Sequence, residues 1–167
     1  MGALPNVFPG YQQVANPEAR WKFELAWNST LKDKPGLPVT EMIEAASQGK
    51  IRGMFVVGEN PIMSEPYAVH TRRAMQQLEF LVVQDIFPTE TAVLADVILP
   101  AAAFAEKDGT YTSTERRVQK LRKAVDPPGE AKPDWQIISL LAGKLGHPFK
   151  YQNTAEIMEE ITSLTPI

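Results

Sequence analysis

The sequence predicts an α/β domain of three layers, in which helices cover a mostly parallel, Rossmann-like sheet. Three short apolar runs, at residues 53–57, 80–84 and 96–99, have the length and composition of buried strands. Segments with helical character separate these runs, and such alternation is typical of parallel sheets with crossover helices. The length of 167 residues suits one domain. We therefore expect a single domain over residues 1–167, with an irregular segment at 1–39 and an α/β core at 40–167.

The N-terminal segment is irregular because five of its 39 residues are prolines, namely Pro5, Pro9, Pro17, Pro35 and Pro38. One helix is expected within it. Asn16 suits the N-cap position and Pro17 the first helical position, which predicts a helix that ends near Trp27.

The core is expected to begin with a helix from Thr40, as the cap, to about Gln48, with Gly49 placed to end it. The run GMFVV at 53–57 is almost wholly apolar, which is typical of a strand buried on both faces. The next four residues, GENP at 58–61, predict the turn that closes this strand.

The following elements repeat the pattern. Residues 65–78 predict a helix that starts near Pro66, and 80–84 predict a second strand, closed by Asp85. A short helix at 90–95 leads into a third strand at 96–99, closed by Pro100.

The last third of the chain combines an irregular segment with two helices. Residues 101–132 are irregular, with short extended stretches expected at 110–114 and 117–121. A helix should open at Asp134 and run to 145, with Gly146 as its stop. Another is expected from Thr154 to about 164.

Composition argues against several classes of partner. The net charge is −3, and both nucleic-acid and membrane-surface binding need a concentrated positive field, so neither partner is expected. The longest apolar run, around 92–105, is broken by Asp96 and Pro100, which predicts no membrane insertion. The opening residues MGALP have neither a basic leader nor an apolar run, which predicts a cytoplasmic location.

The chain has no cysteine. This excludes a disulfide, an iron–sulfur cluster held by this chain and a thiolate ligand to a metal within it. The two histidines, His70 and His147, lie too far apart in sequence to form a helical ligand pair. No catalytic residue and no metal ligand is predicted in the chain.

Polar residues follow the first two expected strands, and they form the candidate site: Gly58, Glu59 and Asn60 after the first, Gln84 and Asp85 at the end of the second. Ligands of parallel sheets bind beyond the carboxyl ends of the strands. A glycine lets a ligand approach the backbone, and a carboxylate can accept two adjacent N–H donors of a guanine edge. Strand ends are also where loops begin, so this pattern alone leaves nucleotide binding open.

The common nucleotide motifs are absent. No Gly-x-Gly-x-x-Gly fingerprint follows a strand, and no phosphate-binding loop that ends in Gly-Lys-Ser or Gly-Lys-Thr is present. A standard NAD or ATP site is therefore disfavoured.

Longer motifs carry a resemblance to a known family. The run GMFVVGENP at 53–61, the segment at 82–119 that begins VVQDIFPTETAVLADVILP, and the pair Asp134-Trp135 resemble the molybdopterin oxidoreductase family in order and spacing. The opening MGALP and the PGY at 9–11 are similar to its formate dehydrogenase branch. The resemblance covers nearly the whole chain.

The resemblance implies that the chain corresponds to the third domain of a catalytic subunit, one that binds a molybdopterin guanine dinucleotide and carries molybdenum or tungsten in the full enzyme. It implies that Asn60, Gln84 and Asp85 surround the guanosine end. Lys107 would reach a phosphate, a ribose or the base, and Asp134 would contact the guanine. The full enzyme would oxidise formate to carbon dioxide, in contact with the remaining domains of the subunit.

The chain also departs from the family pattern. The cysteines for an iron–sulfur cluster and the ligand to the metal are missing, so the chain alone is expected to be inactive. Apolar surface that other domains normally cover would then favour self-association. Alternatives remain: a related member, such as a nitrate reductase or an NADH dehydrogenase subunit, or a structural or interaction domain without a cofactor.

Each site residue also has an ordinary structural interpretation. Asn60 precedes Pro61 and suits a turn, Asp85 suits a turn cap, and Asp134 suits the start of a helix. Lys107 has the character of a solvated lysine. The basic residues Arg116, Arg117, Lys120, Arg122 and Lys123 could attract phosphates, although a charged surface strand or an interdomain contact fits most of them better.

Overall fold

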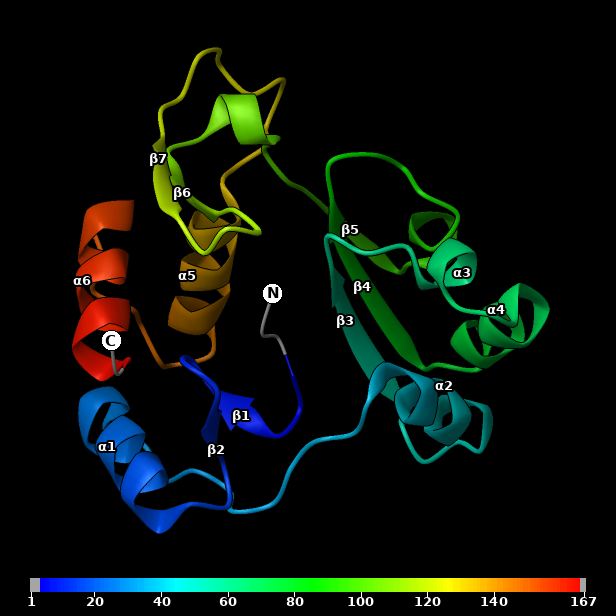
Figure 1. Ribbon diagram of the computed structural model, residues 1–167. Coiled ribbons are helices and arrows are strands. Elements are labelled where there is room, and N and C mark those ends of the chain that lie inside the picture. The colour runs from blue at the N-terminus through cyan, green and yellow to red at the C-terminus, as the bar shows by residue number, and fades with distance from the viewer. Residues whose placement is uncertain (1–3, 166–167) are drawn as a thin grey trace. The chain divides into compact units, whose positions relative to one another are not determined.

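The three expected strands form one parallel sheet. In the computed structural model, which describes residues 4–165, β3 (Gly53–Val57), β4 (Phe80–Asp85) and β5 (Val97–Pro100) lie in the order β3-β4-β5 (Figure 1). Both pairings are parallel, with Phe55 opposite Val82 and Gln84 opposite Leu99. The predicted α/β class with a parallel sheet is confirmed.

The described chain divides into two compact units. One comprises Met1–Met42 and Tyr151–Ile167, and the other comprises Ile43–Lys150 and contains the sheet. Whether both act as a single domain, as the sequence predicts, stays a prediction. The first three residues of the MGALP motif lie outside the described residues.

One face of the sheet carries the core of the second unit. Side chains alternate between the two faces of a strand, and Leu81 and Val83 point to the same face, where both are fully buried. Helices α2 (Val39–Ser47), α3 (Pro61–Ser64) and α4 (Ala68–Gln76) cover this face (Figure 1). They contribute apolar side chains to one cluster: Ile43, Ala46, Ile62, Ala74 and Met75.

The opposite face of the sheet is more open. Phe55 and Val57 are 44% and 42% exposed, and Phe80 is also exposed. The prediction that residues 53–57 are buried on both faces is therefore wrong. Among the described residues the apolar cluster of the helices forms on one face only, so this strand is apolar on a side that the chain leaves partly uncovered.

Several helix boundaries differ from those predicted, and at one of them the cause is a proline. One helix was expected at 65–78, and a short helix that was not expected, α3, precedes it. Helix α3 ends where Glu65 precedes Pro66 and adopts an extended conformation with ψ 144°. Helix α4 therefore starts only at Ala68. Helix α2 begins one residue before its expected cap, Thr40. The short helix near 90–95 is a 3-10 turn, η1 (Ala92–Leu94).

The rest of the second unit follows the sheet. After the 3-10 turn η2 (Phe104–Glu106), β6 (Gly109–Thr112) and β7 (Val118–Leu121) pair as an antiparallel hairpin. These are the two extended stretches expected from the sequence. Helix α5 (Asp134–Lys144) then begins at the predicted aspartate, and Gly146 follows its end with a positive φ of 86°.

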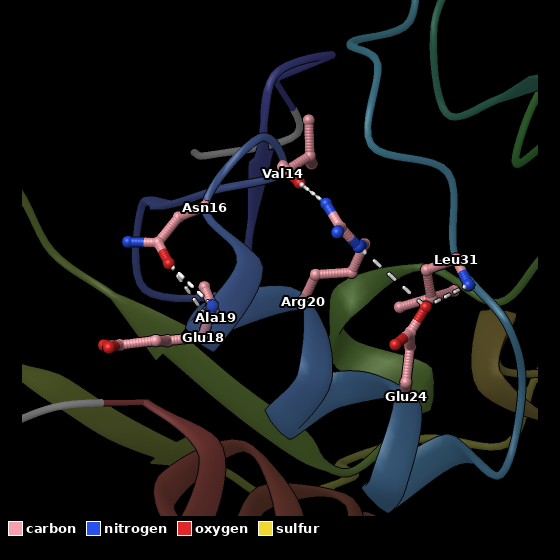
Figure 2. A network of polar contacts seen from close by, with 7 residues as sticks. All are labelled: Val14, Asn16, Glu18, Ala19, Arg20, Glu24 and Leu31. Atoms are coloured by element: carbon pink, nitrogen blue, oxygen red, sulfur yellow. Dashed lines mark hydrogen bonds and ion pairs between the residues drawn. The ribbon is translucent and has the colours of Figure 1, made fainter.

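The first unit joins both ends of the chain. It contains the strands β1 (Val7–Phe8) and β2 (Gln12–Gln13), and the helices α1 (Pro17–Trp27) and α6 (Thr154–Leu164). Figure 2 shows the predicted Asn16 cap, whose side chain accepts hydrogen bonds from the backbone N–H groups of Glu18 and Ala19. The expected start of α1 is confirmed.

Helix α1 is held in the first unit by its aromatic residues and by Lys22. Phe23 is fully buried, with ring centroids 4.7 Å from Phe8 and 4.9 Å from Trp27. The Lys22 ammonium donates to the carbonyl of Leu164 at the last turn of α6, over 2.6 Å, where a positive charge is favoured.

Glu160 of α6 makes a second link between the two ends of the chain. Its carboxylate accepts from Trp27 Nε1 and from the Tyr151 hydroxyl, over 2.9 and 2.6 Å. No helix among the described residues is long and apolar enough to cross a bilayer.

Candidate functional site

The first two strands end at the same edge of the sheet, where the predicted site residues begin. Gly58 follows β3 in a left-handed conformation with φ 61°, which glycine adopts without a steric cost. Its N–H donates to the carbonyl of Gln84 over 2.8 Å and so ties the β3 turn to the end of β4. A Cβ at Gly58 would meet no atom within 4 Å, so backbone conformation, and not close packing within the chain, requires glycine here.

Asn60 connects the β3 turn to the loop after β4. Its Oδ1 accepts from the backbone N–H and the hydroxyl of Thr91, over 3.2 and 2.7 Å. Its Nδ2 donates to Glu90 Oε2 over 2.6 Å, and this hydrogen bond lowers the pKa of Glu90. Thr91 in turn accepts from the N–H of Ile62 in α3 over 3.4 Å. Asn60 is therefore a structural link between two loops, and the cofactor contact implied by the resemblance stays a prediction.

Sequence reasoning missed Glu90 and Thr91. Thr91 is a fully buried polar residue, and its contact with Asn60 spans 31 positions of the sequence. The available signal was the TET run at 89–91, which lies within the segment that resembles the family.

The other strand-end residues differ in their surroundings. Asp85 is partly exposed, its Oδ1 accepts from the N–H of Ile86 over 2.6 Å, and its backbone carbonyl accepts from Ala101. The contact with Ile86 fits the turn-cap interpretation. Glu59 is exposed and accepts a long hydrogen bond, 3.3 Å, from the N–H of Asn60.

Three predicted site residues, Gln84, Lys107 and Asp134, form one polar cluster, the Gln84–Lys107–Asp134 cluster. Gln84 Nε2 donates to Asp134 Oδ1 over 2.8 Å, and Lys107 Nζ donates to Asp134 Oδ2 in an ion pair. Gln84 ends β4, Lys107 follows η2 and Asp134 opens α5, so three separate segments supply the cluster. The sequence named these residues, and the structure brings them into contact.

The charge of Asp134 is stabilised within this cluster. Burial by itself would raise the pKa of Asp134, but hydrogen bonds from Lys107 and Gln84 outweigh it, and the pKa lies below its usual value. The position at the start of α5 also favours a negative charge. Asp134 is thus a half-buried carboxylate that stays ionised at neutral pH.

Gln84 leaves one polar atom unsatisfied. The residue is fully buried, and its Oε1 has no hydrogen-bond donor among the described residues. An unsatisfied buried polar atom costs about 1–3 kcal/mol, and in folded proteins it marks strain, a missing water or a missing ligand. The cluster therefore has the chemistry of an incomplete binding site: a carboxylate, an ammonium and a free amide oxygen.

The remaining candidates do not join the cluster. Arg116 and Arg117 lie at the tip of the β6–β7 hairpin, and Lys123 forms an exposed pair with Asp126 over 2.5 Å. His70 lies beside Glu44 on the surface, over 3.3 Å. No group of three or more metal-binding side chains is found within residues 4–165.

Comparisons with known proteins give a consistent result. A family model described as Molybdopterin oxidoreductase matches residues 2–144. The chain is 55% identical to the F420-dependent formate dehydrogenase subunit alpha of Methanocaldococcus jannaschii, over 99% of this chain and 24% of that protein. It is 42% identical to formate dehydrogenase H of Escherichia coli, over 99% of this chain and 23% of that protein. The chain thus spans about a quarter of the length of these relatives.

A solved structure supports the fold alone. Acetylene hydratase from Pelobacter acetylenicus matches with a TM-score of 0.64 at 23% identity, over 74% of this chain and 18% of that one.

Proposed function

The chain belongs to the molybdopterin oxidoreductase family, and from this premise we propose that it holds the guanosine end of a molybdopterin guanine dinucleotide within a formate dehydrogenase-like catalytic subunit. The single observation that carries the proposal is the Gln84–Lys107–Asp134 cluster at the carboxyl edge of a parallel sheet, the edge where such sheets bind ligands.

The residues present fit the chemistry of this ligand. A guanine edge offers adjacent N–H donors, and the ionised Asp134 carboxylate accepts two such bonds. The ammonium of Lys107 would hold a phosphate of the dinucleotide as a point charge. Asp85, on the same strand as Gln84, offers a second carboxylate beside the base or the ribose.

The chain would bind and orient the cofactor, and the chemistry would depend on residues elsewhere in the subunit. When bound, the pterin with its molybdenum or tungsten ion supplies the acceptor for electrons from the substrate. The chain contains no cysteine that could ligate that metal or an iron–sulfur cluster. We expect the oxidation of formate to carbon dioxide only in the full subunit, and no turnover by the chain alone. The cytoplasmic location stays a prediction.

Titration of the chain with GDP tests the proposal. We expect saturable binding by calorimetry, with NMR shifts at Gln84 and Asp134, and a loss of at least about tenfold in affinity in Asp134→Ala. Asp126→Ala removes an exposed carboxylate from a surface ion pair and should leave binding unchanged. About 5 mM GDP lies well above the dissociation constant expected of a specific site. A folded chain that does not bind GDP at this concentration would refute guanine binding by this chain.

One observation favours the alternative of a structural domain without a cofactor. Lys107 and Asp134 neutralise each other without any ligand, as a purely structural ion pair would. The same titration separates the two functions, because a structural pair gives no saturable nucleotide binding. A nitrate reductase or an NADH dehydrogenase subunit would share the nucleotide contact. The residue at the metal-ligand position, encoded elsewhere in the full gene, would distinguish these enzymes from a formate dehydrogenase.

We also propose that the isolated chain self-associates through the open face of its sheet. Phe55, Val57 and Phe80 expose apolar side chains there, and apolar patches of this kind drive association. Light scattering should show a species larger than the 18.6 kDa chain, and Phe55→Lys should shift it towards the monomer. A wild-type chain that is monomeric at all concentrations would contradict this.

A further inference from the structure

The contact between Lys107 and Asp134 occupies the groups that the proposed ligand needs. The two side chains are partly buried, with 21% and 37% of their surfaces exposed, so each is only partly hydrated and gains from the opposite charge of the other. A ligand that takes one partner leaves the other in a half-buried place without its counter-charge.

We propose that the Lys107–Asp134 ion pair closes the nucleotide site and opens only to a ligand that carries both a base edge with N–H donors and a phosphate. The inference rests on the proposed function. A guanine nucleotide gives Asp134 its new donors and gives Lys107 its new anion in one event, so no charge is left uncompensated. Guanosine offers only the donors and inorganic pyrophosphate offers only the anion.

Gln84, fully buried on the face of the sheet opposite to Val83, supports this exchange. Its Nε2 holds Asp134 Oδ1, whereas Lys107 holds Oδ2. A carboxylate has about four acceptor positions, so Asp134 can bind a base with both oxygens while the bond from Gln84 persists. The buried Gln84 Oε1, which lacks a donor among the described residues, is an independent sign that the cluster is incomplete without a further polar group.

The comparison of three probes with four proteins tests the inference. GDP, guanosine and inorganic pyrophosphate are each titrated into the 167-residue chain by calorimetry. The variants are Lys107→Met, which removes the ammonium at similar length, Lys107→Arg, which keeps the charge, and Lys123→Met, which removes a lysine from an exposed pair. An NMR spectrum of each variant verifies its fold, and Lys107→Arg keeps the test valid if Lys107→Met does not fold.

The exchange predicts a specific pattern. The wild type and Lys123→Met should bind GDP at least about tenfold more tightly than guanosine. They should bind pyrophosphate no more tightly than guanosine. Lys107→Met should weaken GDP and strengthen guanosine several-fold, because its Asp134 has no ion pair to give up. Lys107→Arg should retain the discrimination of the wild type.

The outcomes separate this inference from the proposed function. Equal affinities of the wild type for GDP and guanosine would overturn the exchange and leave guanine binding intact. A Lys107→Met variant that weakens GDP without strengthening guanosine would identify Lys107 as a plain phosphate contact, and this also overturns the exchange. The absence of binding by any of the three probes would overturn the proposed function itself.

Discussion

Replacement of Asn60 by alanine tests whether this residue links two loops. Asn60 Oδ1 is the acceptor for two groups of Thr91, its backbone N–H and its hydroxyl, and Thr91 is fully buried. Alanine leaves both donors without this acceptor. A buried donor that loses its acceptor costs about 1–3 kcal/mol, and the hydroxyl can rotate to recover part of this. We therefore expect Asn60→Ala to lower the free energy of unfolding by about 3 kcal/mol.

Urea titrations followed by NMR resonances of β3 and β4 measure this effect, because these strands lie in the same compact unit as Asn60. Gln48→Ala is the matched control, since its amide makes one exposed contact, with Glu44, and should change stability little. If Asn60→Ala is as stable as Gln48→Ala but binds GDP more weakly than the wild type, Asn60 contacts the ligand and the structural explanation is refuted.

Three further predictions concern single side chains. Burial, with the hydrogen bond and the charge of Glu160, raises the pKa of Tyr151 to about 12, so the stability that Tyr151 contributes should persist up to about pH 10 and fall between pH 10 and 12. Ultraviolet titration should detect the late ionisation of Tyr151, and an unchanged titration in Glu160→Gln would contradict the contribution of Glu160, which adds to that of burial. Phe23→Ala should destabilise the chain by about 3–5 kcal/mol in urea, because the ring is fully buried; a loss below about 1 kcal/mol would be inconsistent with that burial. Lys107→Met should raise the pKa of Asp134 in an NMR titration, so that the stability lost on acidification is lost at a higher pH than in the wild type; an unchanged pKa would show that Lys107 is not its main support.

The elements that sequence predicted well are those with local signals. The start of α1 follows from Asn16 and Pro17, whose effects reach only three residues along the chain. The apolar runs predicted the three strands to within a residue, because length and composition are local properties too. Helix α3 was missed because the GENP run at 58–61 was interpreted only as a turn, and the helix expected to start near Pro66 begins two residues later, at Ala68.

Burial and side-chain partners were harder to predict from the sequence. The apolar run at 53–57 predicted a strand correctly. The exposure of Phe55 depends on which segments cover the sheet, and the composition of the run does not specify those segments. The site residues were named from strand ends and from the resemblance. That Gln84 and Asp134 touch across 50 positions, and Lys107 and Asp134 across 27, depends on the tertiary fold.

The candidate site residues fall into two groups, which differ in whether their hydrogen bonds are satisfied within the chain. The sequence alone could not separate these groups. Asn60 already uses its oxygen twice and its amide nitrogen once within the chain, so a ligand would have to break a bond to reach it. Gln84 has a buried oxygen without a donor among the described residues, and Asp134 is paired with Lys107, a partner that a nucleotide can replace. Since an exchange of partners costs less than the loss of one, we expect recognition of the ligand at Asp134 and Lys107. Asn60 then contributes indirectly, because it fixes the loop on which Glu90 and Thr91 lie.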